Sequence, residues 1–331
     1  MIISDAVAPI ETIALPEPYH RRMDAIPSEG WESVLYIAES GRAWRLDFGA
    51  DARPQTRPTG LRLGGEIEFD DFDPIDFAAD RLVVQFDEHL DVFDVSTGRV
   101  CLRVPDGNRL GACLTPDGRS LLRFNDDETQ IWTFAEQPPP PRTTRLFHEG
   151  SGPLPLFGYG PQSARCVSRP GGGGGFHIVV GHFGFAVAYS LHDGDFARPD
   201  LRLDGARRIH ERFICDPVNT IIGSRHPFVA VNDGYGCRLK LIDVETGDLR
   251  SCPEVVTSRL GYLRYQGATP YGQQGKMLVL TIDGWFLWDL ATDGVIPFCS
   301  WDWDLLHVGQ GRLWAIREGD PTSLRCYPLV L

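Results

Sequence analysis

The chain has little positive charge, and this shortage excludes several kinds of partner. Its 331 residues contain 32 Lys and Arg against 45 Asp and Glu, which gives a formal net charge of −13. Nucleic-acid binding requires a basic surface that neutralises phosphates, so we expect no nucleic-acid partner. Anionic membranes are disfavoured for the same reason, whereas the acidity favours solubility and fits a basic partner.

Long apolar runs and a secretion signal are also lacking. No apolar run approaches the ~18 residues that a membrane-spanning helix requires. Residues 1–18 do not show a charged segment followed by a long apolar one, as a secretory signal would. We therefore expect no membrane partner and a cytoplasmic protein.

The cysteines show no metal-binding spacing. None of the eight forms a C-x-x-C pair, so a zinc ribbon is not supported. Several lie in apolar stretches, such as Cys101 in RVCLRV and Cys215 in RFICDP. Free cysteines in such stretches act as small buried hydrophobes, and we expect reduced structural thiols rather than disulfides.

Motifs of catalysis and cofactor binding are missing as well. The sequence contains neither a G-x-S-x-G elbow nor H-E-x-x-H. His177 and His182 are five residues apart and would face opposite sides of a strand, which makes them a poor metal pair. The glycines at 171–175 lack the G-K-[ST] of a phosphate loop and indicate a flexible connection. We expect no catalytic residue, no metal and no cofactor.

What the chain does contain is a repeat. An apolar residue, a small polar or Asp residue (Pro in the last copy) and another apolar residue recur seven times, usually before a turn. The triplets are Leu46-Asp47-Phe48, Phe93-Asp94-Val95, Trp132-Thr133-Phe134, Tyr189-Ser190-Leu191, Ile242-Asp243-Val244, Trp288-Asp289-Leu290 and Tyr327-Pro328-Leu329. A period of ~40–50 residues built from short strands is typical of a β-propeller, with one blade per repeat.

The repeat predicts an all-β fold, a single seven-bladed β-propeller over residues 1–331. The predicted blades are 17–70, 71–106, 107–150, 151–205, 206–254, 255–299 and 300–331. The last blade lacks a fourth strand, and the alternating segment Ile10–Leu15 is expected to supply it. We expect this N-terminal strand to close the ring, because an open propeller exposes unpaired backbone groups.

Three phrases of the chain resemble known propeller repeats. CLTPDGRSLLRFNDDETQIWTF (113–134) is similar to a WD-repeat blade, and FDVSTG (93–98) and IDVETG (242–247) resemble the turns of quinoprotein-like, YVTN-type repeats. No repeat has a Gly-His pair in the position that completes the WD hydrogen-bond network, so the chain is WD-like. The resemblance implies the propeller fold and carries no chemistry.

In a propeller, the connections from one blade's outer strand to the next blade's inner strand gather on one face around the channel. Arg, Tyr and Trp are enriched at binding hot spots. The residues expected on this face as a partner-binding site are His20, Arg21, Asp71, Asp73, Arg208, His210, Tyr262, Trp301 and Trp303.

Other interpretations of these residues stay open. Trp301 and Trp303 fit packing between blades equally well, with the arginines solvated. Asp71 and Asp73 offer only a fragment of a calcium loop and fit a solvated or partner-facing acidic turn. Arg208 and His210 fit an anion in the channel or salt bridges.

The leading functional hypothesis is a non-catalytic scaffold that binds a protein or peptide, as a subunit of a larger complex. One alternative is a propeller enzyme, a hydrolase or lyase, whose active site at the channel mouth is assembled from distant loops. A second alternative is a sensor of a small anionic ligand.

Overall fold

The computed structural model of the protein describes most of the strands and part of their connections. The described residues are 7–20, 25–28, 32–49, 53–63, 72–105, 111–124, 129–134, 141–144, 163–168, 176–182, 185–191, 207–208, 215–222, 227–233, 238–243, 249–253, 268–270, 276–281, 284–300, 302–309 and 311–328. Every regular element among them is a β-strand.

These strands form seven antiparallel sheets of four strands each within the described residues. Sheet 1 contains β2 (Ile26–Pro27), β3 (Ser33–Ile37), β4 (Arg42–Phe48) and β5 (Pro54–Arg62). Sheet 2 contains β6 (Phe72–Ala78), β7 (Arg81–Phe86), β8 (His89–Asp94) and β9 (Val100–Pro105). Sheet 3 contains β10 (Ala112–Leu114), β11 (Ser120–Phe124), β12 (Thr129–Thr133) and β13 (Arg142–Thr144).

The remaining sheets follow the same order. Sheet 4 contains β14 (Ser163–Ser168), β15 (Phe176–His182), β16 (Phe185–Leu191) and β17 (Arg207–Arg208). Sheet 5 contains β18 (Cys215–Ile222), β19 (Pro227–Asp233), β20 (Arg238–Asp243) and β21 (Leu249–Ser251). Sheet 6 contains β22 (Ala268–Pro270), β23 (Lys276–Thr281), β24 (Gly284–Asp289) and β25 (Val295–Cys299). Sheet 7 contains β26 (Trp303–Gly309), β27 (Arg312–Arg317), β28 (Asp320–Pro328) and β1 (Glu11–Ala14).

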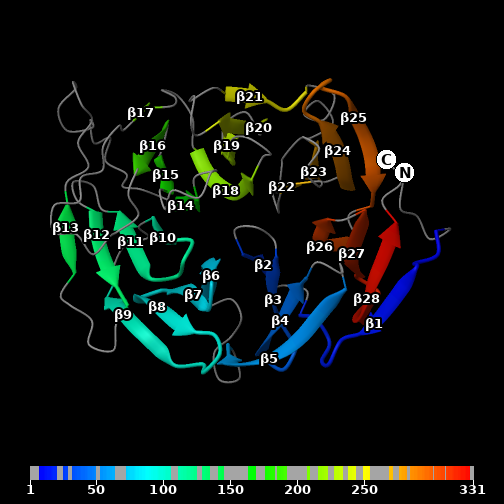
Figure 1. The fold of residues 1–331 in the computed structure, drawn as a ribbon, viewed down its shortest axis with the longest axis horizontal. Coiled ribbons are helices and arrows are strands. Elements are labelled where there is room, and N and C mark those ends of the chain that lie inside the picture. Colours follow the sequence, from blue (N-terminus) through cyan, green and yellow to red (C-terminus); the bar gives the residue numbers. More distant parts are fainter. Residues whose placement is uncertain are drawn as a thin grey trace.

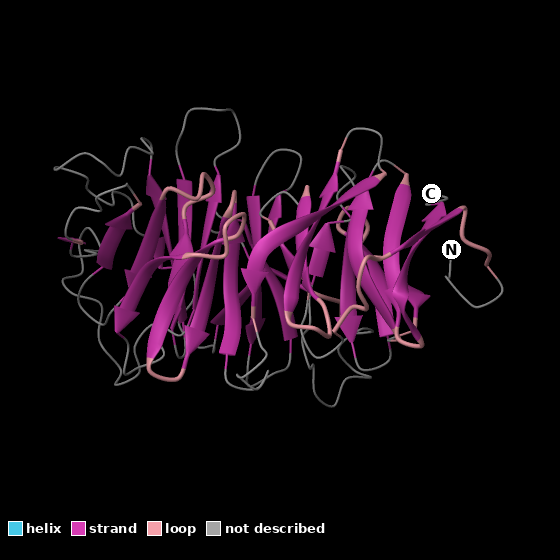
Figure 2. Ribbon diagram, turned by 90° about the horizontal axis from the view of Figure 1, so that it is seen from below, coloured by secondary structure: helices cyan, strands magenta, loops and turns pink. Residues whose placement is uncertain are grey.

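The sheets are arranged in chain order around a common axis (Figure 1). The first strand of each sheet lies nearest this axis, and β2, β6, β10, β14, β18 and β22 contact one another in succession. Seen from the side, the strands run between two faces of a flat molecule (Figure 2). Because each sheet is an antiparallel meander, its first strand begins and its fourth strand ends at the same face, which we call the loop face.

Each of the seven triplets begins within the last residues of the third strand of a sheet, and in sheets 1 to 6 the chain then continues to the fourth strand. Asp94 shows why an Asp suits this position: its Oδ1 accepts hydrogen bonds from the Ser96 hydroxyl (2.7 Å) and from the Thr97 amide (2.8 Å). Its Oδ2 binds the Arg81 guanidinium on the neighbouring strand. Burial opposes ionisation of Asp94, but these hydrogen bonds outweigh it and hold the pKa of this carboxyl well below its usual range. Asp289 caps its own turn in the same way, accepting from the amide of Ala291 at 2.9 Å.

The N-terminal strand supplies the fourth strand of the last sheet, as the alternation in Ile10–Leu15 predicts. β1 pairs antiparallel with β28, with Glu11 opposite Cys326 and Ala14 opposite Ser323. The Glu11 carboxylate also lies 2.9 Å from Arg53, which immediately precedes β5 of sheet 1. This segment therefore links the two ends of the described chain.

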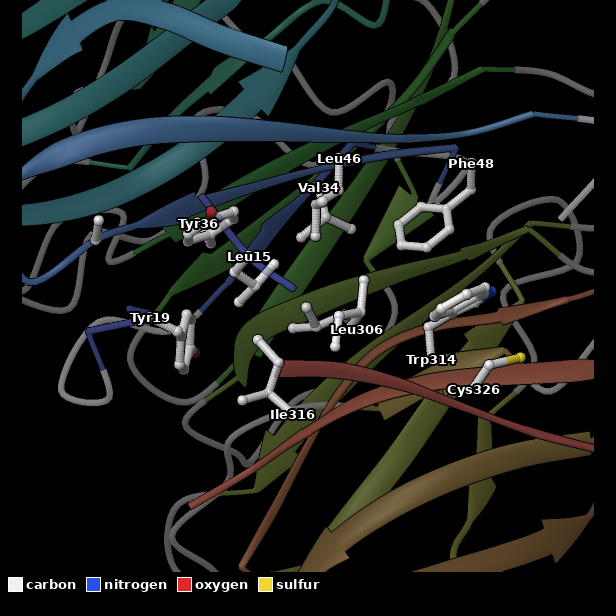
Figure 3. Packing of buried hydrophobic residues seen from close by; sticks show 12 residues of the cluster. Leu15, Tyr19, Val34, Tyr36, Leu46, Phe48, Leu306, Trp314, Ile316 and Cys326 are labelled. Atoms are coloured by element: carbon white, nitrogen blue, oxygen red, sulfur yellow. The ribbon is translucent and has the colours of Figure 1, made fainter. Parts of the chain in front are cut away.

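The side chains after β1 help to fill the core between sheets 7 and 1. Leu15 and Tyr19 belong to one buried cluster with Val34 of β3 and with Trp314 and Ile316 of β27 (Figure 3). The opposite face of β3 is buried in a second cluster, which contains Leu35 and Ile37, so β3 is buried along its whole length.

Adjacent sheets also meet through backbone contacts that only glycine permits. The Gly60 amide on β5 donates to the carbonyl oxygens of Val95 (3.1 Å) and Ser96 (3.0 Å) in sheet 2. In the same contact Gly98 has φ +71°, and a Cβ there would lie 2.0 Å from the Gly60 carbonyl oxygen. Closer to the axis, the Asp76 carboxylate of β6 accepts a hydrogen bond of 2.8 Å from the Leu114 amide of β10.

The cysteines confirm one expectation and correct another. All six whose side chains the structure describes are free thiols, and Cys113, Cys166, Cys252, Cys299 and Cys326 are buried. Cys101, however, is exposed, contrary to the prediction from RVCLRV. The reason is that this stretch forms the outermost strand of sheet 2, where one edge has no neighbouring strand among the described residues.

The glycine contact between sheets 1 and 2 predicts a specific loss of stability. Gly311 has the same φ of +71° as Gly98, but a Cβ there would meet no atom within 4 Å. Gly311→Ala should therefore cost only backbone strain, about 1–2 kcal/mol. Gly98→Ala should cost about 1–3 kcal/mol more, because the two backbones must separate. The free energies of unfolding from urea titrations provide the measurement, and equal losses for the two variants would contradict the contact.

The role of β1 predicts the effect of a truncation. Removing residues 1–16 should lower the midpoint of thermal unfolding and leave the edge of β28 unpaired, which favours aggregation. Removing residues 1–6, which lie outside the described part, is the matched control and should leave the midpoint unchanged. A truncation of residues 1–16 that stays soluble with an unchanged midpoint would rule out this role.

Candidate functional site

Part of the predicted partner-binding site lies outside the described residues. This applies to Arg21, Asp71, His210, Tyr262 and Trp301. The structure places the other four predicted residues, His20, Asp73, Arg208 and Trp303, in four different sheets or connections.

His20 lies where it was predicted, in the connection from β1 to β2 at the loop face. Its amide donates to the Ile37 carbonyl at 2.8 Å, and the preceding Tyr19 forms an isolated bridge with Ala38. The same connection contains Glu17, which binds the Arg42 guanidinium at 3.1 Å and the Ser40 hydroxyl in the turn between β3 and β4.

Asp73 and Arg208 belong to strands rather than to loops. Asp73 is the second residue of the inner strand β6, opposite Gln85. Arg208 ends the outer strand β17, opposite Val187, and so lies beyond the predicted end of its blade at residue 205. The triplet Tyr189-Ser190-Leu191 does not locate this strand, because the stretch between β16 and β17 is longer than the connections between the third and fourth strands of sheets 1, 2, 3, 5 and 6.

Trp303 is buried, with 2% of its surface exposed. It begins β26, packs edge-on against Tyr327 at 5.4 Å and accepts, through its carbonyl, a 2.8 Å hydrogen bond from the Trp285 indole of sheet 6. The structure thus agrees with the alternative interpretation of packing between blades. A surface partner cannot reach this ring directly.

Two ion pairs surround Trp303 that the sequence analysis did not identify. The guanidinium carbons of Arg317 and Arg325 lie 5.7 and 5.9 Å from the centre of its ring. Arg317 lies 3.5 Å from the carboxylate of Asp302, and Arg325 donates a 2.7 Å hydrogen bond to Asp320.

These four charged residues stand around the start of β26 and the turn between β27 and β28, and therefore at the loop face. Arg325 and Thr322 donate hydrogen bonds that hold the pKa of the Asp320 carboxyl below its ordinary value. The available signal in the sequence was the position of these carboxylates, with Asp302 directly before β26 and Asp320 as the first residue of β28.

A further ion pair lies in the half of sheet 2 nearest this face. Asp91 of β8 is buried, and Arg103 of β9 binds both of its oxygens, at 2.7 and 2.6 Å. A bidentate guanidinium offsets much of the desolvation cost of such a carboxylate. His89 stacks on Phe86 at 4.7 Å and places its Nε2 3.5 Å from Asp91.

Within the described ranges, no group of three or more His, Cys, Asp or Glu side chains is placed to hold a metal ion. The described residues likewise contain no helix long and apolar enough to cross a bilayer.

Comparison with known proteins establishes the fold. No protein-family model and no curated protein matches the sequence. The β-propeller domain of Cps50 (Swd1) from Myceliophteria thermophila matches with a TM-score of 0.58 and 10% identity, over 97% of this chain and 100% of that chain. BamB from Moraxella catarrhalis matches with a TM-score of 0.50 and 12% identity, over 97% of this chain and 99% of that chain. The chain is a β-propeller.

The ion pairs near Trp303 predict a pH-dependent variant. Because the folded-state pKa of Asp320 is lowered, its ionised form stabilises the fold above the unfolded pKa, about 3.9, and this contribution is lost as the pH falls further. Asp320→Asn should therefore be less stable than the wild type at pH 7, and the difference should shrink between about pH 5 and pH 2. Thermal melts across this range provide the measurement.

Asp87→Asn is the matched control, because Asp87 is exposed and no ion pair to it is found among the described residues. Its destabilisation at pH 7 should be smaller. If the stability difference between Asp320→Asn and the wild type stays constant from pH 7 to pH 2, ionised Asp320 does not stabilise the fold as proposed.

Proposed function

We propose that this β-propeller is a non-catalytic scaffold that holds a protein or peptide partner on its loop face, as a subunit of a larger complex. In this proposal the seven sheets are the blades of one ring, β1 closes the ring, and residues 1–331 act as a single domain. The partner contacts the connections between blades, including the predicted residues His20, Arg21, Asp71, Tyr262 and Trp301.

The observation that carries the proposal is the arrangement of charge on the loop face. Glu17–Arg42, Asp302–Arg317 and Asp320–Arg325 are fixed in ion pairs within the chain, and each pair is partly exposed. Charged groups held in position before binding lose little conformational entropy when a partner arrives. They also select partners through complementary charge more than they add affinity.

The partner class follows from the same balance of charge. A net charge of −13 disfavours nucleic acid and anionic membranes, and we propose neither as a partner. The six free thiols of the described residues fit a reducing compartment, so we place the protein in the cytoplasm.

Charge reversal on the loop face tests the proposal. Glu39 and Glu88 are exposed in the turns between the second and third strands of sheets 1 and 2, whereas Glu32 is exposed at the opposite face. A tagged wild type should retain a stoichiometric partner from source-cell lysate at moderate salt. Glu39→Arg and Glu88→Arg should each reduce the amount of recovered partner about tenfold, which corresponds to a loss of roughly 1.4 kcal/mol of binding free energy.

Glu32→Arg is the matched control and should retain the partner fully, with all three variants melting near the wild-type temperature. If no partner is recovered, or if all three variants lose it equally, the loop-face scaffold is excluded. Metabolite and hydrolase screens of the wild type would then test the enzyme and the anion sensor.

A further inference from the structure

The outer strand of sheet 2 has an edge without a neighbouring strand in the described structure. β9 is the last strand in the order β6-β7-β8-β9 and lies on the rim of the molecule (Figure 1). Val100 is 44% exposed, and Cys101 is exposed at a bulge, where the register shifts between Phe93–Val100 and Val92–Leu102. Backbone groups along such an edge are a template for an added strand.

The other long outer strands are blocked in ways that β9 is not. β5 contains Pro54 and Pro58, and its Gly60 amide is already bound by a turn of sheet 2. β25 contains Pro297. Proline cannot donate to a ladder and is a common protection of an edge strand. β9 has proline only at its last residue, Pro105.

Apolar side chains line the junction between β9 and sheet 3. Leu102 of β9 and Trp132 and Phe134 of sheet 3 are partly buried and pack against one shared core cluster. Two polar atoms on this side of β12, the Trp132 indole nitrogen and the Gln130 side-chain oxygen, have no hydrogen-bond partner. Both atoms are buried, so the surface that this junction offers to a partner is formed by its partly exposed apolar side chains.

Arginines stand at both ends of the strand. Arg99 precedes β9, is exposed, and has no ion pair among the described residues. Arg103 remains 60% exposed although it binds Asp91. Arg119, in the turn between β10 and β11 of sheet 3, is 83% exposed. Its Nε lies 3.9 Å from the Asp117 carboxylate, which is too far for a hydrogen bond. On a chain with a net charge of −13, such a basic edge is complementary to an acidic partner.

We infer that β9 is a docking site for an extended segment of a partner protein in which acidic and apolar residues alternate. The segment adds as a fifth strand to sheet 2, so that its backbone pairs with the free edge of β9. Its carboxylates bind Arg99 and Arg103, and its apolar side chains cover Val100 and the Leu102–Trp132–Phe134 junction. This site is separate from the loop face.

A synthetic probe tests the inference directly. The probe is a fluorescein-labelled heptapeptide in which Asp or Glu alternates with Val, titrated with the full-length protein and followed by fluorescence anisotropy. It should bind saturably, and raising the salt concentration should weaken binding because the contacts are ionic. Arg99→Glu should weaken binding at least about tenfold, since it replaces attraction with repulsion.

Matched controls separate strand addition from general charge attraction. Arg62→Glu changes an exposed arginine at the end of β5 and should bind the probe like the wild type. The same peptide with alternate backbone amides N-methylated keeps its charge but cannot pair as a strand, and it should not bind. A peptide in which Lys replaces the acidic residues should not bind either.

Each contrary result overturns the inference. These results are an absence of binding up to about 1 mM protein, equal binding of the N-methylated peptide, or equal effects of Arg62→Glu and Arg99→Glu. Sedimentation that shows a dimer lost in Arg99→Glu would instead assign the edge to a second copy of the chain. The loop-face variant Glu39→Arg should bind the probe normally, so failure here is distinguishable from failure of the proposed function.

Discussion

The pairing of β1 with β28 is the contact on which the rest of the structure depends. The other described sheets are meanders of consecutive strands, but sheet 7 combines the N-terminal strand with the last three. Joining chain ends so far apart carries a loop-closure entropy that local hairpins avoid. Backbone pairing over four residues stabilises the fold too little to offset that entropy. Leu15 and Tyr19, which extend the segment into the core between sheets 7 and 1, supply the apolar burial that makes the pairing stable.

Between sheets, a repeated contact of arginine with an aromatic ring adds to the apolar core. Arg45 of sheet 1 lies over Phe77 of sheet 2 at 5.8 Å, and Arg81 of sheet 2 lies over Phe134 of sheet 3 at 5.9 Å. Arg250 of sheet 5 lies over Trp288 of sheet 6 at 5.8 Å. A planar guanidinium can stack on a ring and bind a carboxylate at once, which a lysine ammonium does less well. This double use gives a physical reason for a chain in which arginine greatly outnumbers lysine.

The sequence predicts the strands better than it predicts the site, for a physical reason. The triplets locate the third strands because an apolar–Asp–apolar pattern before a turn serves local hydrogen bonding, as Asp94 shows. The exposure of Cys101 depends on which strand is outermost, and that is a property of the sheet rather than of RVCLRV. The end of sheet 4 at Arg208, beyond the predicted blade boundary at residue 205, does not follow from the triplets because loop length has no periodic signal.

Trp303 shows a second limit of prediction from the sequence. Its residue type fits a binding hot spot and a core equally well, and only the three-dimensional neighbours decide. Tyr327 and Arg325 lie more than twenty positions away along the chain, on a strand that antiparallel pairing brings back beside β26 through β27. No local pattern in the sequence contains that proximity.

The distribution of paired and unpaired charge separates the two surfaces of this molecule. At the loop face, Arg42, Arg317 and Arg325 each have a carboxylate of the chain itself, so a partner there meets charged groups of fixed position. Arg62, at the end of β5, is exposed and has no such carboxylate among the described residues. At β9, Arg99 has no such carboxylate among the described residues, and the backbone edge is open as well. An unpaired guanidinium in water keeps its full Coulombic attraction for an incoming anion, whereas a paired one must first give up its partner. The unpaired Arg99 is therefore suited to attracting an anionic partner, whereas the paired arginines of the loop face select a partner through the fixed positions of their charges.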